Sequence, residues 1–296
     1  MMDTRRKDEM SDSFTYKTAT LHHADAFTLL ASLPDNSVTA TITDPPYGLV
    51  EYKPDQLEKM RAGHGGVWRL PPVLDGVKRR PLPRFTTLTN KDRETMRRFF
   101  EDLARELVRV MVPGGNVLVA SNPLVSHLVA DSMERGGLEV RGQIVRLVQT
   151  LRGGDRPKNA EHDWQDVSVM PRAQFEPWVM LRKSPEGTIA HNLETYNAGG
   201  WRRYEDAPFG DVLRAPVARG REREISEHPS LKPQALMRTL VLASLPCGEG
   251  LVLDPFAGSG STLAAAAALG FEAVGCEIDD GYYEAARESI PRLAEL

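Results

Sequence analysis

Two patterns of hydrophobic and polar positions recur along the chain. Short apolar runs at residues 38–43, 116–120 and 251–254 are bounded by turn-forming residues, as is typical of strands buried inside a sheet. Residues 93–112 instead carry apolar side chains at helical spacing, which predicts an amphipathic helix: Met96, Phe99, Phe100, Leu103, Leu107, Val110 and Met111. Pro113 and the two glycines after it are expected to stop that helix.

The same patterns predict further elements in alternation. Helices are expected at residues 26–33, 123–136, 232–245 and 263–269, and strands at 143–148, 178–181 and 273–277. This alternation predicts an α/β fold with a mostly parallel, doubly wound sheet, whose ligands bind at the carboxyl ends of the strands. The stretches 51–90 and 152–227 do not fit it, and long irregular segments are usually functional or mobile.

Composition narrows the class of protein without giving a function. With 296 residues, of which 41% are hydrophobic and 26% charged, the chain suits a soluble globular protein with one large α/β domain and an insertion, or with a domain and a half. Cys247 and Cys276 are the only cysteines, and residues 1–13 are charged, unlike a signal peptide. These features, and apolar runs too short to cross a bilayer, predict a cytoplasmic protein without membrane contact.

The net charge of −4 argues mildly against nucleic acid, but the charges are unevenly distributed. Basic residues dominate at 78–98 and 141–158, whereas acidic residues dominate from Glu277 to Glu288. A chain with a basic middle can present a positive face to phosphates, although solvated surface charges would produce the same pattern.

The first candidate chemistry is the tetrapeptide Asp44-Pro45-Pro46-Tyr47, directly after the predicted strand at 38–43. Proline fixes φ and has no N–H, so the two proline carbonyls are fixed acceptors, while Tyr47 offers an aromatic face. A carboxylate beside them suits the capture of a flat ring that bears an amino group. An ordinary turn is the alternative, since Asp-Pro and Pro-Pro commonly mark turns.

A second motif, Asp254-Pro255-Phe256-Ala257-Gly258-Ser259-Gly260-Ser261-Thr262, leads from a predicted strand into an alanine-rich helix. Its glycines let the backbone approach a ligand, and the helix N-terminus offers free N–H donors. Glu277 ends the next strand, where a carboxylate can accept both hydroxyls of a ribose. Leu263 replaces the third glycine of a dinucleotide motif and no lysine follows the loop, which excludes an NAD site and a P-loop. The pattern fits a nucleoside ligand such as S-adenosylmethionine.

In this order the two motifs resemble those of the DNA amino-methyltransferases of the β arrangement, in which a DPPY motif precedes an FxGxG motif. Two more segments match that family: residues 24–38, which begin Ala24-Asp25-Ala26-Phe27, and His228-Pro229-Ser230-Leu231-Lys232-Pro233. The resemblance covers residues 19–50 and 225–290 with recognisable motifs and the middle in outline.

The resemblance implies a circularly permuted class I methyltransferase fold with an irregular DNA-recognition insertion. It predicts a flexible tail at 1–18, a catalytic half at 19–151 with a loop insertion at 51–90, a target-recognition region at 152–227 that includes one core strand near 175–182, and a cofactor-binding half at 228–296. A packing insertion or a dimer surface is the alternative for 152–227, because Trp and Arg are also enriched at protein interfaces.

Carried over residue by residue, the resemblance implies an S-adenosylmethionine site. Phe256, Ala257, Gly258, Ser259, Gly260, Ser261 and Thr262 would form its loop, Asp254 would lie beside the donor's amino group, Glu277 would take the ribose hydroxyls, Asp25 the adenine amino group and Lys232 the donor's carboxylate. Structural alternatives exist: Asp254 could cap the loop, Asp25 the following helix, and Lys232 could be a solvated first-turn residue.

The expected reaction methylates the exocyclic amino group of a base flipped out of duplex DNA. Asp44 and the Pro45 carbonyl would accept the amino hydrogens and so expose the nitrogen lone pair, while Tyr47 stacks on the base. Asp44 at the head of the tetrapeptide favours adenine N6; cytosine N4 is the alternative, for which the family more often has Ser there. Further alternatives are a non-catalytic DNA-binding or cofactor-sensing module and an RNA or protein-glutamine methyltransferase.

Basic and aromatic side chains of the irregular stretches are the candidate DNA contacts, since they reach phosphates, base edges and base faces. The expected contacts are Arg79, Arg80, Arg84, Arg152, Arg156, Lys158, Trp201, Arg202 and Arg203. Double-stranded DNA as partner implies a nucleoid-associated location, and the resemblance leaves a homodimer and a cognate restriction enzyme open. No metal is expected, because the histidines are scattered and Glu161-His162-Asp163 is typical of a solvated loop.

Overall fold

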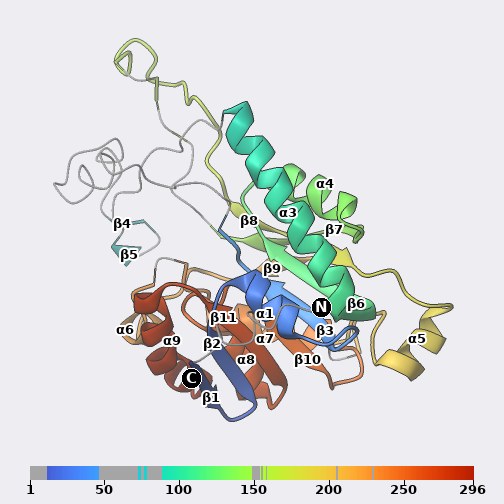
Figure 1. The fold of residues 1–296 in the computed structure, drawn as a ribbon. Coiled ribbons are helices and arrows are strands. Elements are labelled where there is room, and N and C mark those ends of the chain that lie inside the picture. The colour runs from blue at the N-terminus through green and yellow to red at the C-terminus, as the bar shows by residue number, and fades with distance from the viewer. Residues whose placement is uncertain are drawn as a thin grey trace.

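The computed structural model describes residues 12–46, 73–74, 77–78, 89–148, 154, 156–157, 159–204, 206–228 and 230–296. Within them a nine-stranded sheet runs through the molecule in the order β1-β2-β11-β10-β3-β6-β8-β7-β9 (Figure 1). Its strands are β1 Ser13–Tyr16, β2 Ala19–His23, β3 Val38–Thr43, β6 Met111–Ala120, β7 Glu139–Leu147, β8 Phe175–Arg182, β9 Val212–Arg214, β10 Leu251–Asp254 and β11 Glu272–Glu277. β4 Val73–Leu74 and β5 Val77–Lys78 form a separate antiparallel pair.

The centre of the large sheet is parallel. β2, β11, β10, β3 and β6 pair in parallel, and the fold class predicted from the sequence is confirmed. β8 runs antiparallel between β6 and β7, and β1 is antiparallel at the edge. The alternation of apolar residues does not reveal the direction of β8, because a strand buried on both faces has the same pattern in either orientation.

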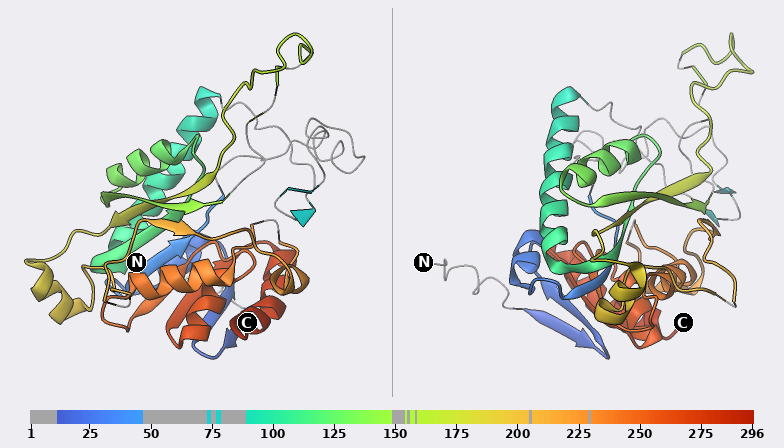
Figure 2. Two further views of the ribbon diagram at one scale, coloured as in Figure 1. Left: turned by 180° about the vertical axis from the view of Figure 1, so that it is seen from behind. Right: turned by 90° about the vertical axis from the view of Figure 1, so that its right-hand side faces the viewer.

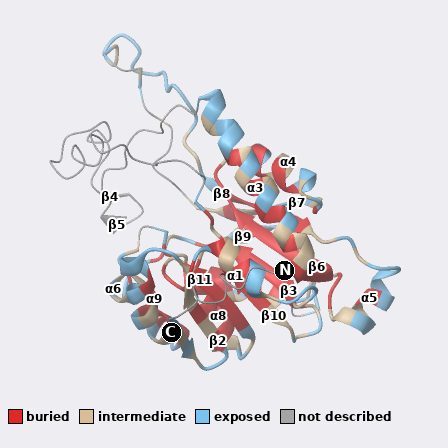
Figure 3. Cartoon of the chain, viewed as in Figure 1, coloured by how far each residue is buried: buried red, intermediate tan, exposed pale blue. Residues whose placement is uncertain are grey.

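Helices cover both faces of the sheet, as Figure 2 shows. They are α1 Ala26–Ser32, α3 Asn90–Val110, α4 Ser126–Arg135, α5 Ile189–Tyr196, α6 Arg221–Ile225, α7 Gln234–Ser244, α8 Ser261–Leu269 and α9 Asp280–Ala294. Successive strand residues face opposite layers: Val117 and Val119 pack with α1, α3 and α4, whereas Leu118 and Ala120 pack with α7, α8 and α9. All residues of β3 and β6 are buried, so the middle of the sheet is the core of the molecule (Figure 3).

The junction between α3 and β6 differs from the prediction. The helix ends at Val110, and Met111 already pairs with Val38 in the sheet, so Pro113 and its two glycines do not stop the helix. They lie instead in an irregularity of β6, before Asn116 pairs with Ala40. Met111 is completely buried at the start of β6.

Helix α7 also starts later than expected. Its first residue is Gln234 and Pro233 is the N-cap, which leaves Lys232 in the segment that leads into the helix. None of the helices that the structure describes has the length and apolarity needed to span a bilayer.

Candidate active site

The first part of the site is the turn between β10 and α8. β10 ends at Asp254, whose buried carboxylate accepts hydrogen bonds from Thr43 Oγ1 at 2.7 Å and from the Phe256 N–H at 3.2 Å. Burial raises the pKa of Asp254 to about 6. The bond from Thr43 joins this turn to the end of β3, so the two sequence motifs meet at the carboxyl ends of neighbouring strands. Asp254 thus caps the loop, and its contact with a donor stays a prediction.

Gly258 and Gly260 give the turn its shape. Their φ angles of +51° and +75° lie in the region that L side chains rarely adopt. A Cβ at Gly260 would lie 2.3 Å from Ile290 Cγ1, and one at Gly258 would lie 3.1 Å from His228 Cε1. The turn therefore has little room for side chains at these positions, and its backbone can approach a bound nucleoside closely.

The hydroxyls of the same turn are bonded within the protein. Ser259 Oγ lies 2.8 Å from Ser261 Oγ, and Thr262 Oγ1 donates to the Ile42 carbonyl at 3.3 Å. All these hydroxyl-bearing residues are buried. Cofactor contact by them and by Ala257 stays a prediction, and their hydroxyls have structural roles of their own.

Two predicted acids lie beside the turn. Glu277 ends β11, and its carboxylate accepts the Gly258 N–H at 2.9 Å. Asp25 follows β2, and the Ala24 N–H donates to the Glu277 carbonyl at 3.2 Å, which places both acids at adjacent strand ends. Asp25 also caps α1 by accepting the Phe27 N–H at 2.9 Å. Helix capping was the structural alternative to its expected contact with adenine.

An apolar surface completes this half of the site. The ring of Phe256 lies 5.9 Å from that of Phe99, which in turn lies 6.0 Å from Phe27. Two acids, a glycine turn and aromatic rings together fit a nucleoside, since carboxylates accept hydroxyl and amino hydrogens and the rings contact its apolar parts.

The second part of the site is Asp44, directly after β3. Lys232 Nζ donates to Asp44 Oδ2 at 2.6 Å and to Glu176 Oε1 at 3.1 Å. Burial alone would lower the pKa of Lys232, but the two carboxylates outweigh burial and raise it. The Lys232 side chain is only 12% exposed, which excludes the alternative of a solvated first-turn residue. Its backbone N–H donates to Ser261 Oγ at 3.3 Å, so Lys232 touches both halves of the site.

Two charged residues at the site were missed by the sequence analysis. Glu176 on β8 accepts Lys232 through one oxygen and Arg146 Nη1 at 2.9 Å through the other. Arg146 belongs to the basic stretch 141–158, for which phosphate contact is one interpretation, yet its side chain is only 5% exposed. The sequence did carry a signal for both residues, since Arg146 lies inside the strand expected at 143–148 and Glu176 inside the core strand expected near 175–182. A charged side chain that is buried in a strand requires a partner of opposite charge.

His228 lies against the glycine turn. Its Nδ1 accepts the Ser230 N–H at 3.1 Å, and its ring makes an edge contact with Tyr282, with centroids 4.4 Å apart. Burial lowers the pKa of His228 to about 4, so the neutral imidazole is the form that the fold holds.

This shift predicts a dependence of stability on pH. His228 has a pKa near 4 in the folded chain and near 6.5 in the unfolded chain, so between these pH values the unfolded chain binds more protons. The free energy of unfolding therefore falls as the pH is lowered from 6.5 to 4. His228→Asn keeps an acceptor near the Ser230 N–H and removes the titration. We expect the variant to lose less free energy of unfolding than the wild type between pH 6.5 and 4.5 in urea titrations.

The exposed His191 provides the control, since His191→Asn should leave the dependence as in the wild type. Equal slopes for the wild type and His228→Asn would contradict the assignment.

The predicted DNA contacts lie in different places. Five of the predicted DNA contacts fall outside the described residues: Arg79, Arg80, Arg84, Arg152 and Lys158. Tyr47 of the catalytic tetrapeptide also falls outside them, whereas Pro45 is buried and Pro46 is exposed directly after Asp44. Arg156 is exposed at the start of a segment that extends away from the sheet and returns at β8 (Figures 1 and 2).

Trp201, Arg202 and Arg203 lie at the other end of the sheet. The Arg202 N–H donates to the Ala243 carbonyl near the end of α7 at 2.9 Å, and Trp201 stacks on Phe209 with centroids 5.4 Å apart. The structure does not bring these residues beside Asp44. Their contact with DNA stays a prediction, and it would have to be made near the amino ends of the parallel strands.

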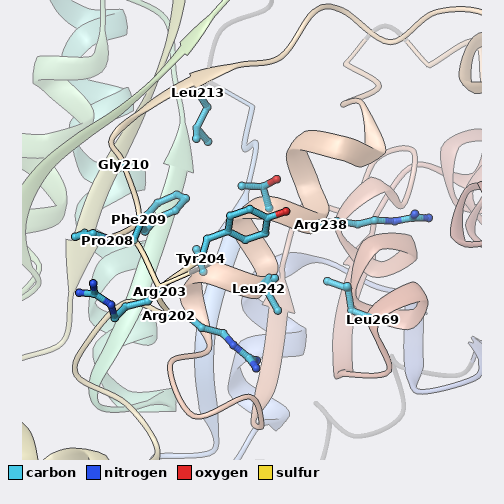
Figure 4. A pocket seen from close by; sticks show the side chains of 13 residues that line it. Arg202, Arg203, Tyr204, Pro208, Phe209, Gly210, Leu213, Arg238, Leu242 and Leu269 are labelled. Carbon is cyan, nitrogen blue, oxygen red and sulfur yellow. The ribbon is translucent and has the colours of Figure 1, made fainter.

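A cavity of about 510 Å³ lies beside this segment (Figure 4). Tyr204, Phe209, Leu242 and Leu269 line it, so it lies toward the end of α7 that is remote from Lys232. The candidate active site is therefore separate from this cavity. Within the ranges that the structure describes, no group of three or more His, Cys, Asp or Glu side chains is placed to hold a metal ion.

The fold is that of the class I methyltransferases. The fold is similar to that of TTHA0409 from Thermus thermophilus, solved in complex with S-adenosyl-L-methionine, with a TM-score of 0.55, 21% identity and 92% of each chain covered. It is also similar to PvuII DNA methyltransferase (cytosine-N4-specific), with a TM-score of 0.59, 13% identity and coverage of 95% of this chain and 93% of that one.

Sequence comparison gives the family. A family model for DNA methylase, N6_N4_Mtase, matches residues 38–288, and the chain belongs to this DNA methylase family. It is similar to the type II methyltransferase M.HindIII of Haemophilus influenzae, with 27% identity over 290 residues that cover 90% of this chain and 93% of that protein. The resemblance drawn from the motifs is thereby confirmed.

Proposed function

We propose that this DNA methylase transfers a methyl group from S-adenosylmethionine to the N6 amino group of adenine in double-stranded DNA. The observation that carries the proposal is the bond from Thr43 to Asp254, which joins the residue before Asp44 to the glycine turn at 2.7 Å. A group held by Asp44 and a donor held by the turn would then share one edge of the sheet, where doubly wound folds bind ligands.

The residues of the turn fit the donor. Glu277 would accept the ribose hydroxyls, Asp25 would accept the adenine amino group, and the backbone at Gly258 would approach the methionine part. These are the roles that the resemblance to the DNA amino-methyltransferases implies. When bound, S-adenosylmethionine supplies an electrophilic methyl group. TTHA0409, solved with this compound, and M.HindIII, named as a methyltransferase, support the choice of donor.

Asp44 would act on the acceptor. Its carboxylate and the Pro45 carbonyl would accept the two amino hydrogens of a flipped base, and this contact grows stronger as positive charge develops on the nitrogen. The outward segment that carries Arg156 ends at Phe175, where β8 begins beside the carboxyl end of β6, and its arginine suits contact with phosphate.

Cytosine N4 is the second candidate acceptor. One structural neighbour, PvuII methyltransferase, is cytosine-N4-specific, and the matched family has both amino groups in its name. The aspartate at position 44 favours adenine, because the family more often has serine at this place in cytosine enzymes.

The test is incubation of the purified chain with mixed-sequence duplex DNA and isotopically labelled donor, followed by digestion and mass spectrometry of the nucleosides. Labelled N6-methyladenine is the expected product. Labelled N4-methylcytosine without N6-methyladenine would make the chain a cytosine enzyme, and no labelled nucleoside under conditions where the donor binds would contradict the function.

A further inference from the structure

A buried network of alternating charges leads from the core to Asp44. It consists of Arg146, Glu176, Lys232 and Asp44, in that order, from β7, β8, the segment before α7 and the end of β3. The side chains are between 5% and 19% exposed. We refer to these four residues as the charge network.

The inner end of the charge network is fixed to the backbone. Arg146 donates from Nε to the Ala215 carbonyl at 2.9 Å and from Nη2 to the Pro216 carbonyl at 2.7 Å. Its remaining terminal nitrogen donates to Glu176 Oε2 at 2.9 Å. With three donated bonds the guanidinium has little freedom to turn, so it holds Glu176 in one place.

Glu176 is held from both sides. Its Oε2 also accepts Trp178 Nε1 at 3.2 Å, while Oε1 faces Lys232 at 3.1 Å. Burial pushes the pKa of Glu176 up, but the charges of Lys232 and Arg146 outweigh burial and hold it at about 2. Glu176 is therefore a carboxylate at every pH at which the protein is expected to work.

The position of Lys232 determines how much negative charge Asp44 keeps. An ammonium paired with one carboxylate neutralises that carboxylate, whereas an ammonium shared between two neutralises each only in part. Asp44 needs its charge, because the developing positive charge on an amino nitrogen is stabilised by an anion. The distances of 2.6 and 3.1 Å show that Lys232 is shared.

We propose that Glu176 is a positioning residue for methyl transfer: it holds the Lys232 ammonium between two carboxylates, so that Asp44 is oriented by the ammonium without being neutralised by it. The inference rests on the proposed function and adds to it a residue that does not touch the base. Its basis is the contact geometry of the charge network.

The test compares Glu176→Gln with Glu176→Asp. Glutamine keeps the shape and removes the charge that shares Lys232, so we expect kcat to fall roughly 10- to 100-fold with the KM values for DNA and donor within about threefold. Aspartate keeps the charge, so we expect kcat of Glu176→Asp to stay much closer to the wild-type value than kcat of Glu176→Gln. Equal loss in both variants would mean that shape rather than charge matters and would overturn the proposal.

The pH profile of kcat gives a readout that a purely structural role would not move. Removing a neighbouring anion lowers the pKa of a carboxylate, so the acidic limb for Glu176→Gln should lie at lower pH than in the wild type. Asp44 also interacts electrostatically with His228 and Asp254, and both are unchanged in the variant. An acidic limb that stays in place, or moves to higher pH, would overturn the proposal.

Coupling to Lys232 is tested in a double variant. Lys232→Met should lower kcat by itself, and adding Glu176→Gln should then lower it no further, since the ammonium that Glu176 holds is gone. A further loss equal to that of Glu176→Gln alone would show that Glu176 acts independently of Lys232.

Glu139 supplies the matched control. It pairs with Arg182 at 2.6 Å across the same two strands, at the end remote from Asp44. Glu139→Gln makes the same chemical change in a similar pair far from Asp44, so its kcat should equal that of the wild type. A loss comparable to that of Glu176→Gln would count against the proposal.

A wild-type chain that makes no methylated nucleoside would contradict the proposed function, whereas an active wild type with an equally active Glu176→Gln would contradict this inference alone.

Discussion

Replacing Asp44 by alanine is expected to lower kcat for methyl transfer by roughly 10³-fold while donor and DNA affinities change by less than about threefold. The loss follows because the carboxylate would accept an amino hydrogen and stabilise charge that develops only in the transition state. Folding should survive the change, since Lys232 keeps its contact with Glu176 at 3.1 Å and is not left as an unpaired buried charge.

The measurement is single-turnover kinetics on a defined duplex, with donor affinity from calorimetry and stability from thermal melting. Asp35→Ala is the matched control: Asp35 pairs with Arg109 at 2.9 Å, is 71% exposed, and lies before the start of β3 rather than after its end. That variant should methylate as fast as the wild type, because exposed ion pairs contribute little. Asp44→Ala with kcat within about tenfold of the wild type would remove Asp44 from the chemistry.

Gly260→Ala is expected to destabilise the fold by roughly 2–5 kcal/mol and to weaken donor binding strongly. Two effects add: the positive φ of +75° is costly for alanine, and the new Cβ would lie 2.3 Å from Ile290 Cγ1. Either the turn or α9 must shift, and a shift of the turn displaces the backbone that would hold the donor.

Gly270→Ala separates the two effects. Gly270 has φ of +78° but no atom within 4 Å of its would-be Cβ, so only the conformational cost of roughly 1–2 kcal/mol applies. Both glycines flank α8, one at each end. Urea unfolding and donor titrations on the two variants give the comparison, and equal losses of stability and of donor affinity would show that contact with Ile290 does not matter.

Much of the site was predictable because its residues follow strands. A run of buried residues ends at Thr43 and another at Asp254, and in a parallel sheet such ends share one edge, so the meeting of Asp44 with the glycine turn was expected from the pattern alone. The same rule placed Glu277 at the end of β11.

The charge network was not predictable in this way. Lys232 and Asp44 are 188 residues apart in sequence, and Lys232 and Glu176 are 56 apart, so neither local spacing nor periodicity connects them. The pairing of Arg146 with Glu176 depends on β8 being antiparallel to β7, which the pattern of apolar residues does not encode.

The place of Trp201 and Arg202 was not predictable either. Aromatic and basic residues on an irregular stretch indicate a binding surface, but not which end of the sheet the stretch returns to. Asn116 fixes that choice here: its side chain donates to the Gly200 carbonyl at 2.8 Å and to the Ser244 carbonyl at 3.3 Å, which ties the stretch to the amino ends of the strands.

The way Lys232 is shared also restricts which side chain can stand at position 44. Exchanging Asp44 for serine, the residue found more often in cytosine enzymes, would leave Arg146 and Lys232 with Glu176 as the anion of the group, and an excess positive charge would face the incoming base. A serine at position 44 would therefore need a compensating exchange at position 232 to keep the charges of the group in balance.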